Sequence, residues 1–347
     1  MAPRSTLAAV ALAAALVCAA PLSASAADAQ HSLSAPQEHQ HSGGHTVLWS
    51  TPNSISADDN TQLVGVDPLT GKEVARFGIG KEAETWSIAL SKDQHTAYLA
   101  NHYSGTLSVV DLAGRKLIKE IPLGVDADYV ALSPDGTTAY VTSMVSESLS
   151  VVDLTAGKVV TTLSLGAPAE GVAISRDGKS AYLGIYSRDR IDRMDLSSYK
   201  VTASYTGGKA PRRVLLSPDG KTLYSTDYYG GTVSAYQVDN PAAKPEQVNV
   251  GGQPYQAQLS QDGRKLYVAD TAGSSVSVVD TRNMTARRIT VPDGFGEVAA
   301  TPDGKQLFEA QNNQGGIAVI DLRHGKATGT LDGTGLPGPT ALALTTR

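Results

Sequence analysis

The sequence predicts an all-β fold, a seven-bladed β-propeller with four antiparallel strands in each blade. The first observation is a Ser or Thr that opens a tight turn and recurs at separations of 42, 42, 42, 43 and 41 residues. These positions are Ser91, Ser133, Ser175, Ser217, Ser260 and Thr301. The second is a partial unit at each end of the chain, and the two parts together complete one further unit. A period of about 40–45 residues with four strands per unit is typical of propeller blades.

Residues 133–166 illustrate how one unit is built. Pro134 presets φ for a turn, Asp135 accepts hydrogen bonds from the local backbone, and Gly136 tolerates a left-handed conformation. Short apolar runs on either side of this turn indicate a hairpin. The four strands of this unit are expected at residues 129–132, 139–142, 148–153 and 159–165.

Both ends of the chain are expected to contribute to one blade. Residues 340–345 match the first strand of a unit, and residues 46–78 contain matches to the second, third and fourth strands. A strand exchanged across this seam closes the ring and leaves no open sheet edge. The blades of a propeller domain at 46–347 are therefore expected at 46–78 with 340–345, 85–121, 128–165, 170–205, 212–250, 255–291 and 296–331.

The second strand of each unit carries a recognisable motif. Ala139-Tyr140-Val141-Thr142 resembles the YVTN-type β-propeller repeat. Variants of it occupy residues 97–100, 181–184, 223–226 and 266–269, with a degenerate copy at 307–310. The resemblance covers nearly all of residues 46–345 and implies a seven-bladed propeller of the surface-antigen or lactonase-like kind. It implies a cell-surface or periplasmic protein without assigning its role, because the repeated residues are structural.

The first 26 residues have the pattern of a secretory signal peptide. Arg4 supplies the positive charge, residues 7–20 form the apolar run, and Ala24-Ser25-Ala26 form a small-residue cleavage site. The apolar run is short for a membrane span, and no later stretch is long enough. We therefore expect a periplasmic or secreted protein. The single cysteine, Cys18, lies within the signal, so the mature chain is expected to contain no disulfide and no thiol nucleophile.

Residues 27–45 form a polar segment without apolar periodicity, and they are expected to be a flexible tail. Three of its histidines, His39, His41 and His45, could share a copper, nickel or zinc ion, because neutral imidazole binds these metals. The alternative is a polar linker without a ligand. Apart from such a divalent metal, no cofactor is predicted.

The net charge of −5 argues against nucleic acid as a partner, because a basic surface supplies most of the non-specific affinity for it. No membrane span is expected either. The partner is instead expected to be an unknown small molecule or another exported protein, and the oligomeric state stays open.

The expected ligand site is the mouth of the central channel, the face that carries the blade-to-blade connections and the loops between second and third strands. Positions that build the blades repeat, whereas positions at the entry to each innermost strand differ from blade to blade. A single asymmetric site requires such divergence, although neutral drift would also produce it. The candidate ligand-binding residues are Trp86, His102, Tyr103, Asp128, Glu170, Tyr186, Arg212, Arg213, Asp227, Tyr228, Tyr255 and Glu297.

Two chemical roles are open for these residues. Arg212 and Arg213 could bind a carboxylate or phosphate, or form ion pairs with Glu170 or Asp128, which we consider the stronger expectation. The carboxylates could ligate a hard cation. The sequence contains no G-x-S-x-G or H-E-x-x-H motif, so no catalytic residue is assigned. An aspartate closes the third strand of every unit, and this repetition assigns it to the scaffold.

The sequence thus favours a non-enzymatic binding or recognition module that acts through the mouth of its channel. The first alternative is a lactonase-like hydrolase of a small cyclic ester. The second is a periplasmic metal-handling protein that uses its histidine tail.

Overall fold

The computed structural model describes residues 46–52, 60–81, 83–292, 296–311, 315–331 and 338–346. The expected signal peptide at 1–26 and the histidine tail at 27–45, with His39, His41 and His45, lie outside the described residues. Within these ranges no helix has both the length and the apolar character needed to cross a bilayer.

The described chain forms seven sheets of four antiparallel strands, which confirms the predicted fold class. Blade 1 consists of β28 (Leu342–Thr346), β1 (Thr46–Ser50), β2 (Asn60–Val66) and β3 (Glu73–Lys81). Blade 2 consists of β4 (Thr85–Leu90), β5 (Thr96–Asn101), β6 (Thr106–Asp111) and β7 (Lys116–Pro122). Blade 3 consists of β8 (Tyr129–Leu132), β9 (Thr138–Ser143), β10 (Ser148–Asp153) and β11 (Lys158–Ser164). Blade 4 consists of β12 (Ala169–Ile174), β13 (Ser180–Ile185), β14 (Arg190–Asp195) and β15 (Lys200–Thr206).

The remaining three blades follow the same order. Blade 5 consists of β16 (Pro211–Leu216), β17 (Thr222–Asp227), β18 (Thr232–Gln237) and β19 (Glu246–Asn249). Blade 6 consists of β20 (Pro254–Leu259), β21 (Lys265–Asp270), β22 (Ser275–Asp280) and β23 (Thr285–Thr290). Blade 7 consists of β24 (Val298–Ala300), β25 (Gln306–Ala310), β26 (Ile317–Asp321) and β27 (Lys326–Thr330).

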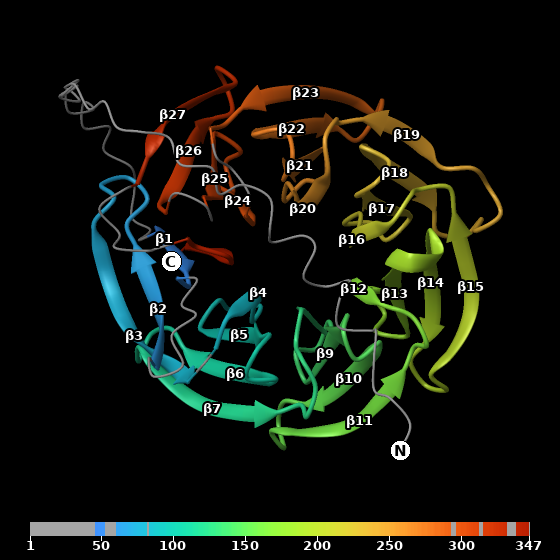
Figure 1. Ribbon diagram of the computed structural model, residues 1–347, viewed down its shortest axis with the longest axis horizontal. Coiled ribbons are helices and arrows are strands. Elements are labelled where there is room, and N and C mark those ends of the chain that lie inside the picture. Colours follow the sequence, from blue (N-terminus) through green and yellow to red (C-terminus); the bar gives the residue numbers. More distant parts are fainter. Residues whose placement is uncertain are drawn as a thin grey trace, which may run out of the picture. The chain divides into compact units, whose positions relative to one another are not determined.

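The ring closes through a strand from the C-terminal end of the chain. The innermost strands β4, β8, β12, β16, β20, β24 and β28 each contact the next, and β28 contacts β4 (Figure 1). β28 pairs with β1 in antiparallel register from Thr46 opposite Thr346 to Ser50 opposite Leu342. The Trp49 indole N–H also donates to Thr345 Oγ1 at 3.0 Å. The expected exchange of a strand across the seam is therefore confirmed.

The recurring turn between first and second strands owes its sequence to a small hydrogen-bond network. Ser133 Oγ donates to Asp135 Oδ1 at 2.5 Å and accepts from the Thr138 N–H at 3.0 Å. Gly136 has a φ of 72°, which a residue with a side chain rarely adopts. The same pair of hydroxyl contacts recurs from Ser91, Ser175, Ser217, Ser260 and Thr301. The Ser or Thr therefore recurs because each of these turns needs the same hydrogen bonds.

The aspartates that close the third strands also have a structural role. Asp153 Oδ1 accepts from the Ala156 N–H at 2.8 Å and so caps the turn into the fourth strand. Equivalent contacts to backbone N–H groups are made by Asp67, Asp111, Asp195, Asp280 and Asp321. These carboxylates are thus part of the scaffold.

The core is divided among the interfaces between blades. One cluster joins Leu107 of blade 2 to Val130, Val141 and Val152 of blade 3, all at most 2% exposed. Both faces of a strand such as β10 are buried, which explains its nearly continuous apolar sequence.

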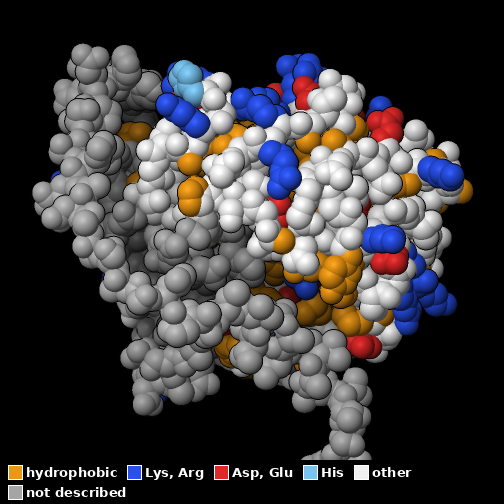
Figure 2. All heavy atoms as spheres, turned by 45° about the horizontal axis from the view of Figure 1, so that its top comes forward, with side chains coloured by type: hydrophobic (Ala, Val, Ile, Leu, Met, Phe, Trp, Pro, Cys, Tyr) orange, Lys and Arg blue, Asp and Glu red, His pale blue; other side chains and the backbone are white. Residues whose placement is uncertain are grey.

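On the face drawn in Figure 2, acidic and basic side chains of the described residues are interspersed.

Candidate functional site

The side chains at the entries to the innermost strands converge across the channel. The Arg213 guanidinium of blade 5 lies 3.7 Å from the ring centroid of Tyr129 in blade 3. Its Nη2 also donates to Glu297 Oε1, just before β24 of blade 7, at 2.8 Å. These three blades are not neighbours in the ring, so such contacts are possible only across its centre. Arg213 therefore links three sectors of the mouth.

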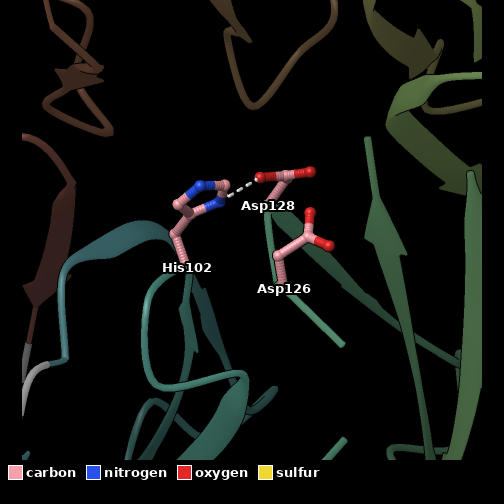
Figure 3. A group of neighbouring side chains, drawn as sticks. All are labelled: His102, Asp126 and Asp128. Carbon is pink, nitrogen blue, oxygen red and sulfur yellow. Dashed lines mark hydrogen bonds and ion pairs between the residues drawn. The ribbon is translucent and has the colours of Figure 1, made fainter. Parts of the chain in front are cut away.

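A histidine–carboxylate pair lies at the junction of blades 2 and 3. His102 follows β5, and Asp126 and Asp128 precede β8, so both connections bring their side chains to the mouth. His102 Nδ1 lies 2.7 Å from Asp128 Oδ1, and the Asp126 carboxylate lies beside them (Figure 3). The Asp128 side chain is fully buried, whereas 12% of the His102 side chain is exposed. This arrangement holds the imidazole against the carboxylate and leaves part of the ring accessible.

An indole fixes the plane of the imidazole. The rings of Trp86 and His102 stack with centroids 4.0 Å apart and an interplanar angle of 3°. Trp86 Nε1 in turn donates to Glu84 Oε1 at 3.0 Å. His102 is thereby held both by a hydrogen bond at Nδ1 and by a planar stacking partner, an arrangement suited to a proton-transfer group.

Burial and hydrogen bonding together place a proton within this pair. Burial works to lower the pKa of His102, but the hydrogen bond and the charge of Asp128 outweigh it and raise that pKa above its ordinary 6.5. For Asp128, burial is the dominant effect and raises the pKa above 3.8, although hydrogen bonds from His102 and the Met144 N–H stabilise the carboxylate. Both shifts favour a proton shared between Nδ1 and Asp128.

The same cluster is the group of described residues best suited to a divalent cation. One donor atom each from His102, Asp126 and Asp128 lies within 4.8 Å of the others. The carboxylate oxygens already accept hydrogen bonds from within the protein. Asp126 accepts from Ser143 Oγ at 2.5 Å and Ser146 Oγ at 2.7 Å. These bonds tie the loop after β9 to Asp126.

A second cluster surrounds Arg212. Its Nε lies 3.1 Å from Glu170 Oε2, which confirms the expected ion pair. Arg213, in contrast, pairs with Glu297 across the channel and not with Asp128, because its side chain extends over Tyr129 toward blade 7. The Arg212 guanidinium lies 4.4–4.9 Å from the ring centroids of three tyrosines, namely Tyr186, Tyr228 and Tyr255. This is a cation–π cage around a charge that is already paired.

Burial and the charge of Glu170 act in opposite directions on the pKa of Arg212 and in the same direction on that of Tyr255. Burial works to lower the pKa of Arg212, but the Glu170 carboxylate more than offsets it and raises that pKa. Burial and the charges of Glu170 raise the pKa of Tyr255 well above its ordinary 10.0. Tyr255 therefore keeps its proton and can donate a hydrogen bond at the mouth.

Several buried polar atoms at the mouth have no hydrogen-bond partner among the described residues. They are Glu84 Oε2, Arg213 Nε and Gln256 Oε1. Buried polar groups in native proteins are nearly always satisfied, so such a concentration indicates water or a polar ligand at this place. Two cavities of about 540 and 650 Å³ lie elsewhere, at turns of blades 6 and 7 and at the outer strands of blades 1 and 2. We place the site at the mouth because the chemistry converges there.

Most of the residues expected at the mouth are found together. Asp227 is an exception, since it is 0% exposed and accepts hydrogen bonds from Ser225, Thr232 and Ser234 within blade 5. Tyr103 extends outward and is 63% exposed. Sequence reasoning missed Glu84 and Asp126. Both lie two residues before a position already singled out, Trp86 and Asp128, and a comparison of the blades extended by two residues would have found them.

Comparisons with known proteins agree on the architecture. A family model described as "Lactonase, 7-bladed beta-propeller" matches residues 180–291, from β13 in blade 4 to the end of blade 6. No curated protein matches this chain. Among solved structures, the periplasmic gluconolactonase PpgL of Pseudomonas aeruginosa is 20% identical with a TM-score of 0.71, covering 86% of this chain and 99% of that one.

Two further solved structures have the same fold. A putative 6-phosphogluconolactonase from Bacteroides fragilis is 18% identical with a TM-score of 0.70, covering 87% of this chain and 98% of that one. Hydrazine synthase of Kuenenia stuttgartiensis is 24% identical with a TM-score of 0.63, covering 69% and 76%. At these identities the likeness concerns the fold. The YVTN description does not recur among these matches, and the chain is similar to seven-bladed propellers of the lactonase kind.

Proposed function

We propose that the protein hydrolyses a small cyclic ester, a lactone, with His102 as general base and Asp128 as its orienting partner. The observation that carries this proposal is the 2.7 Å contact between His102 Nδ1 and Asp128 Oδ1 at the mouth. The match of residues 180–291 to the lactonase family supports the same class of reaction. A fold by itself does not imply an activity, so the argument depends on the site.

The proposed reaction uses Nε2, the imidazole nitrogen that does not contact Asp128. With its Nδ1–H donated to Asp128, His102 presents the lone pair of Nε2, and 12% of its side chain is exposed. Nε2 accepts a proton from a water molecule while the water oxygen bonds to the lactone carbonyl carbon. The ring C–O bond then breaks, and His102 returns the proton to the leaving alkoxide, which yields a hydroxy acid.

The donor proposed for the carbonyl oxygen is the Tyr255 hydroxyl of the second cluster. Tyr255 lies beside Arg212, whose charge Glu170 already pairs, and the charge of Asp128 also acts on Tyr255. Donors that face developing negative charge stabilise the tetrahedral intermediate of acyl transfer. Tyr255 is suited to this role because its hydroxyl stays protonated.

The test is lactone hydrolysis by His102→Gln and Asp128→Asn. We expect kcat/KM to fall about 10²–10⁴-fold in the first variant, with circular dichroism and Tm unchanged. The matched control is His324→Gln, which alters an exposed histidine in the turn after β26 and should keep full activity. Wild-type activity should rise with pH through an apparent pKa above 6.5, because only neutral His102 accepts a proton. An unchanged rate in His102→Gln would contradict the proposal.

A recognition function is the second candidate, and one observation favours it. Tyr103 and Tyr229, beside the mouth, are 63% and 65% exposed. Exposed aromatic side chains provide contact area at low entropic cost, which suits a protein partner. If no lactone is hydrolysed, protection of these two tyrosines upon addition of a candidate partner would favour this function.

Export and a metal-binding tail are part of the proposal. Residues 1–26 have a signal-peptide pattern, and N-terminal sequencing of the exported protein should begin at Ala27. Titration of the synthetic peptide 27–45 with copper or zinc tests the metal site at His39, His41 and His45. An exported protein that still begins at residue 1 would contradict cleavage of the signal peptide. A peptide that binds neither copper nor zinc would contradict the metal site.

A further inference from the structure

The clusters around His102 and Arg212, together with the Arg213–Glu297 pair, carry more negative than positive charge. Five carboxylates lie there, from Glu84, Asp126, Asp128, Glu170 and Glu297. The positive groups in contact with them are two guanidinium groups and the imidazole of His102. Even with His102 protonated, the balance is negative, and this sign bears on which substrates can enter.

Both arginines are already neutralised by the protein. Arg212 lies 3.1 Å from Glu170, with a side chain 17% exposed, and Arg213 lies 2.8 Å from Glu297, with a side chain 9% exposed. Removing one partner from a buried pair leaves the other charge uncompensated, which is strongly unfavourable. A substrate phosphate or carboxylate would have to displace a glutamate to gain its arginine. The arginines are therefore poor anchors for a second anion.

The other three carboxylates share a single imidazole. Glu84, Asp126 and Asp128 all act on His102, and each of their charges raises its pKa. Among the described residues, no Lys or Arg forms an ion pair with any of the three. Glu84 is 7% exposed, and its Oε2 has no hydrogen-bond partner within the described chain. The proposed reaction centre thus lies in a negative field.

We infer that the lactone hydrolysed at this mouth is uncharged, bearing neither a phosphate nor a carboxylate group. This inference rests on the proposed function and adds the substrate class to it. An anionic substrate would be repelled by the three carboxylates around His102 and would find both arginines occupied. Trp86, Tyr186 and Tyr228 are each partly exposed, and their accessible aromatic surface suits packing of an uncharged ring.

The experiment compares two probes that differ in one group, glucono-δ-lactone and its 6-phosphate. We expect kcat/KM of the uncharged lactone to exceed that of the phosphorylated lactone by about tenfold or more at low ionic strength. The ratio should shrink when salt is raised from about 0.02 M to about 0.5 M, because salt screens the repulsion. A preference for the 6-phosphate would overturn the inference and leave the proposed function intact.

Charge variants test the cause of the selectivity. Glu84→Gln and Asp126→Asn each remove one negative charge, so each should lower the ratio of uncharged to phosphorylated kcat/KM about three- to tenfold. Glu246→Gln removes one charge from the outer strand β19 and serves as the matched control, with the ratio unchanged. Ratios in the two mouth variants equal to the wild-type ratio would contradict the electrostatic cause.

Measurements of ligand binding test the charge selectivity of the mouth independently of lactone hydrolysis. The corresponding lactams are stable isosteres of the two lactones, and the fluorescence of Trp86 in a Trp49→Phe background reports their binding. If neither lactone is hydrolysed, the proposed function fails. In that case, tighter binding of the uncharged lactam still supports the selectivity of the mouth, and tighter binding of the phosphorylated lactam overturns it.

Discussion

At the scale of single residues, burial and charge separate the scaffold from the candidate site. The repeated tyrosines Tyr140, Tyr182, Tyr224 and Tyr267 are at most 7% exposed and pack between blades, as their repetition predicts. The positions that differ between blades instead form ion pairs and ring stacks at the mouth. One buried carboxyl belongs to neither group. Glu309 on β25 is 0% exposed and faces blade 6, and neither of its oxygens has a hydrogen-bond partner within the described chain.

Glu309→Gln is expected to change how stability depends on pH. Burial, followed by the charge of Asp270, raises the pKa of Glu309 to about 8, against an ordinary value of 4.5. Above pH 4.5 the unfolded chain releases a proton that the folded protein retains, so this group lowers the free energy of unfolding as pH rises toward 8. The variant should match the wild type near pH 4 and be more stable by roughly 3–5 kcal/mol above pH 8.

Thermal or urea unfolding at pH 4, 6 and 8.5 measures this difference. Asp303→Asn, on an exposed turn of the same blade, is the control, since its carboxylate is stabilised and its pKa lowered. A difference between Glu309→Gln and the wild type that is the same at all three pH values would contradict the argument.

At the scale of the element, six of the seven blades depend on the hydroxyl that organises their first turn. Six turns use the same Ser or Thr with an aspartate two residues later, and this network was foreseeable because all its members are local in sequence. The register of the sheets is equally local, since short turns of this kind set the pairing of adjacent strands. The aspartates that close the third strands were foreseeable for the same reason, because each accepts hydrogen bonds from the turn that directly follows it.

Ser133→Ala should destabilise the protein without altering its fold. The change leaves the Thr138 N–H without its 3.0 Å acceptor and removes one of three hydrogen bonds to Asp135 Oδ1, the other two coming from Thr137, at a cost of about 1–2 kcal/mol. Ser133→Thr keeps the hydroxyl, as Thr301 does in blade 7, and should stay near the wild-type stability. Equal stability of the alanine variant and the wild type in urea unfolding would refute the role of this hydroxyl.

At the scale of the whole molecule, closure of the ring holds the mouth together. β28 completes blade 1 and also lies between blade 7 and blade 2, where Thr340 Oγ1 donates to the Thr85 carbonyl at 2.7 Å. The Leu342 N–H contacts Glu297 Oε2 at 3.4 Å, so the seam also contributes to the position of a residue at the mouth. Fold and site are coupled through this one strand.

Deletion of residues 340–347 should abolish cooperative unfolding or lower Tm by many degrees. The deletion removes β28, exposes the edge of β1 and leaves blade 1 with three strands. Removal of residues 27–45 serves as the control and should leave Tm unchanged, because this segment precedes the first strand. A C-terminally shortened protein that melts like the intact one would show that closure does not depend on β28.

The sequence alone determined the period, the number of blades, the turn chemistry and the closing strand, because each depends on residues near one another or on repetition. It also identified most residues at the mouth as positions that vary. Only the tertiary structure decided their partners. Arg213 and Glu297 are 84 residues apart, and Trp86 stacks on a histidine from the next strand. The first pairing depends on side-chain directions across a closed ring and the second on side-chain directions at the end of a hairpin, and no local pattern in the chain encodes either.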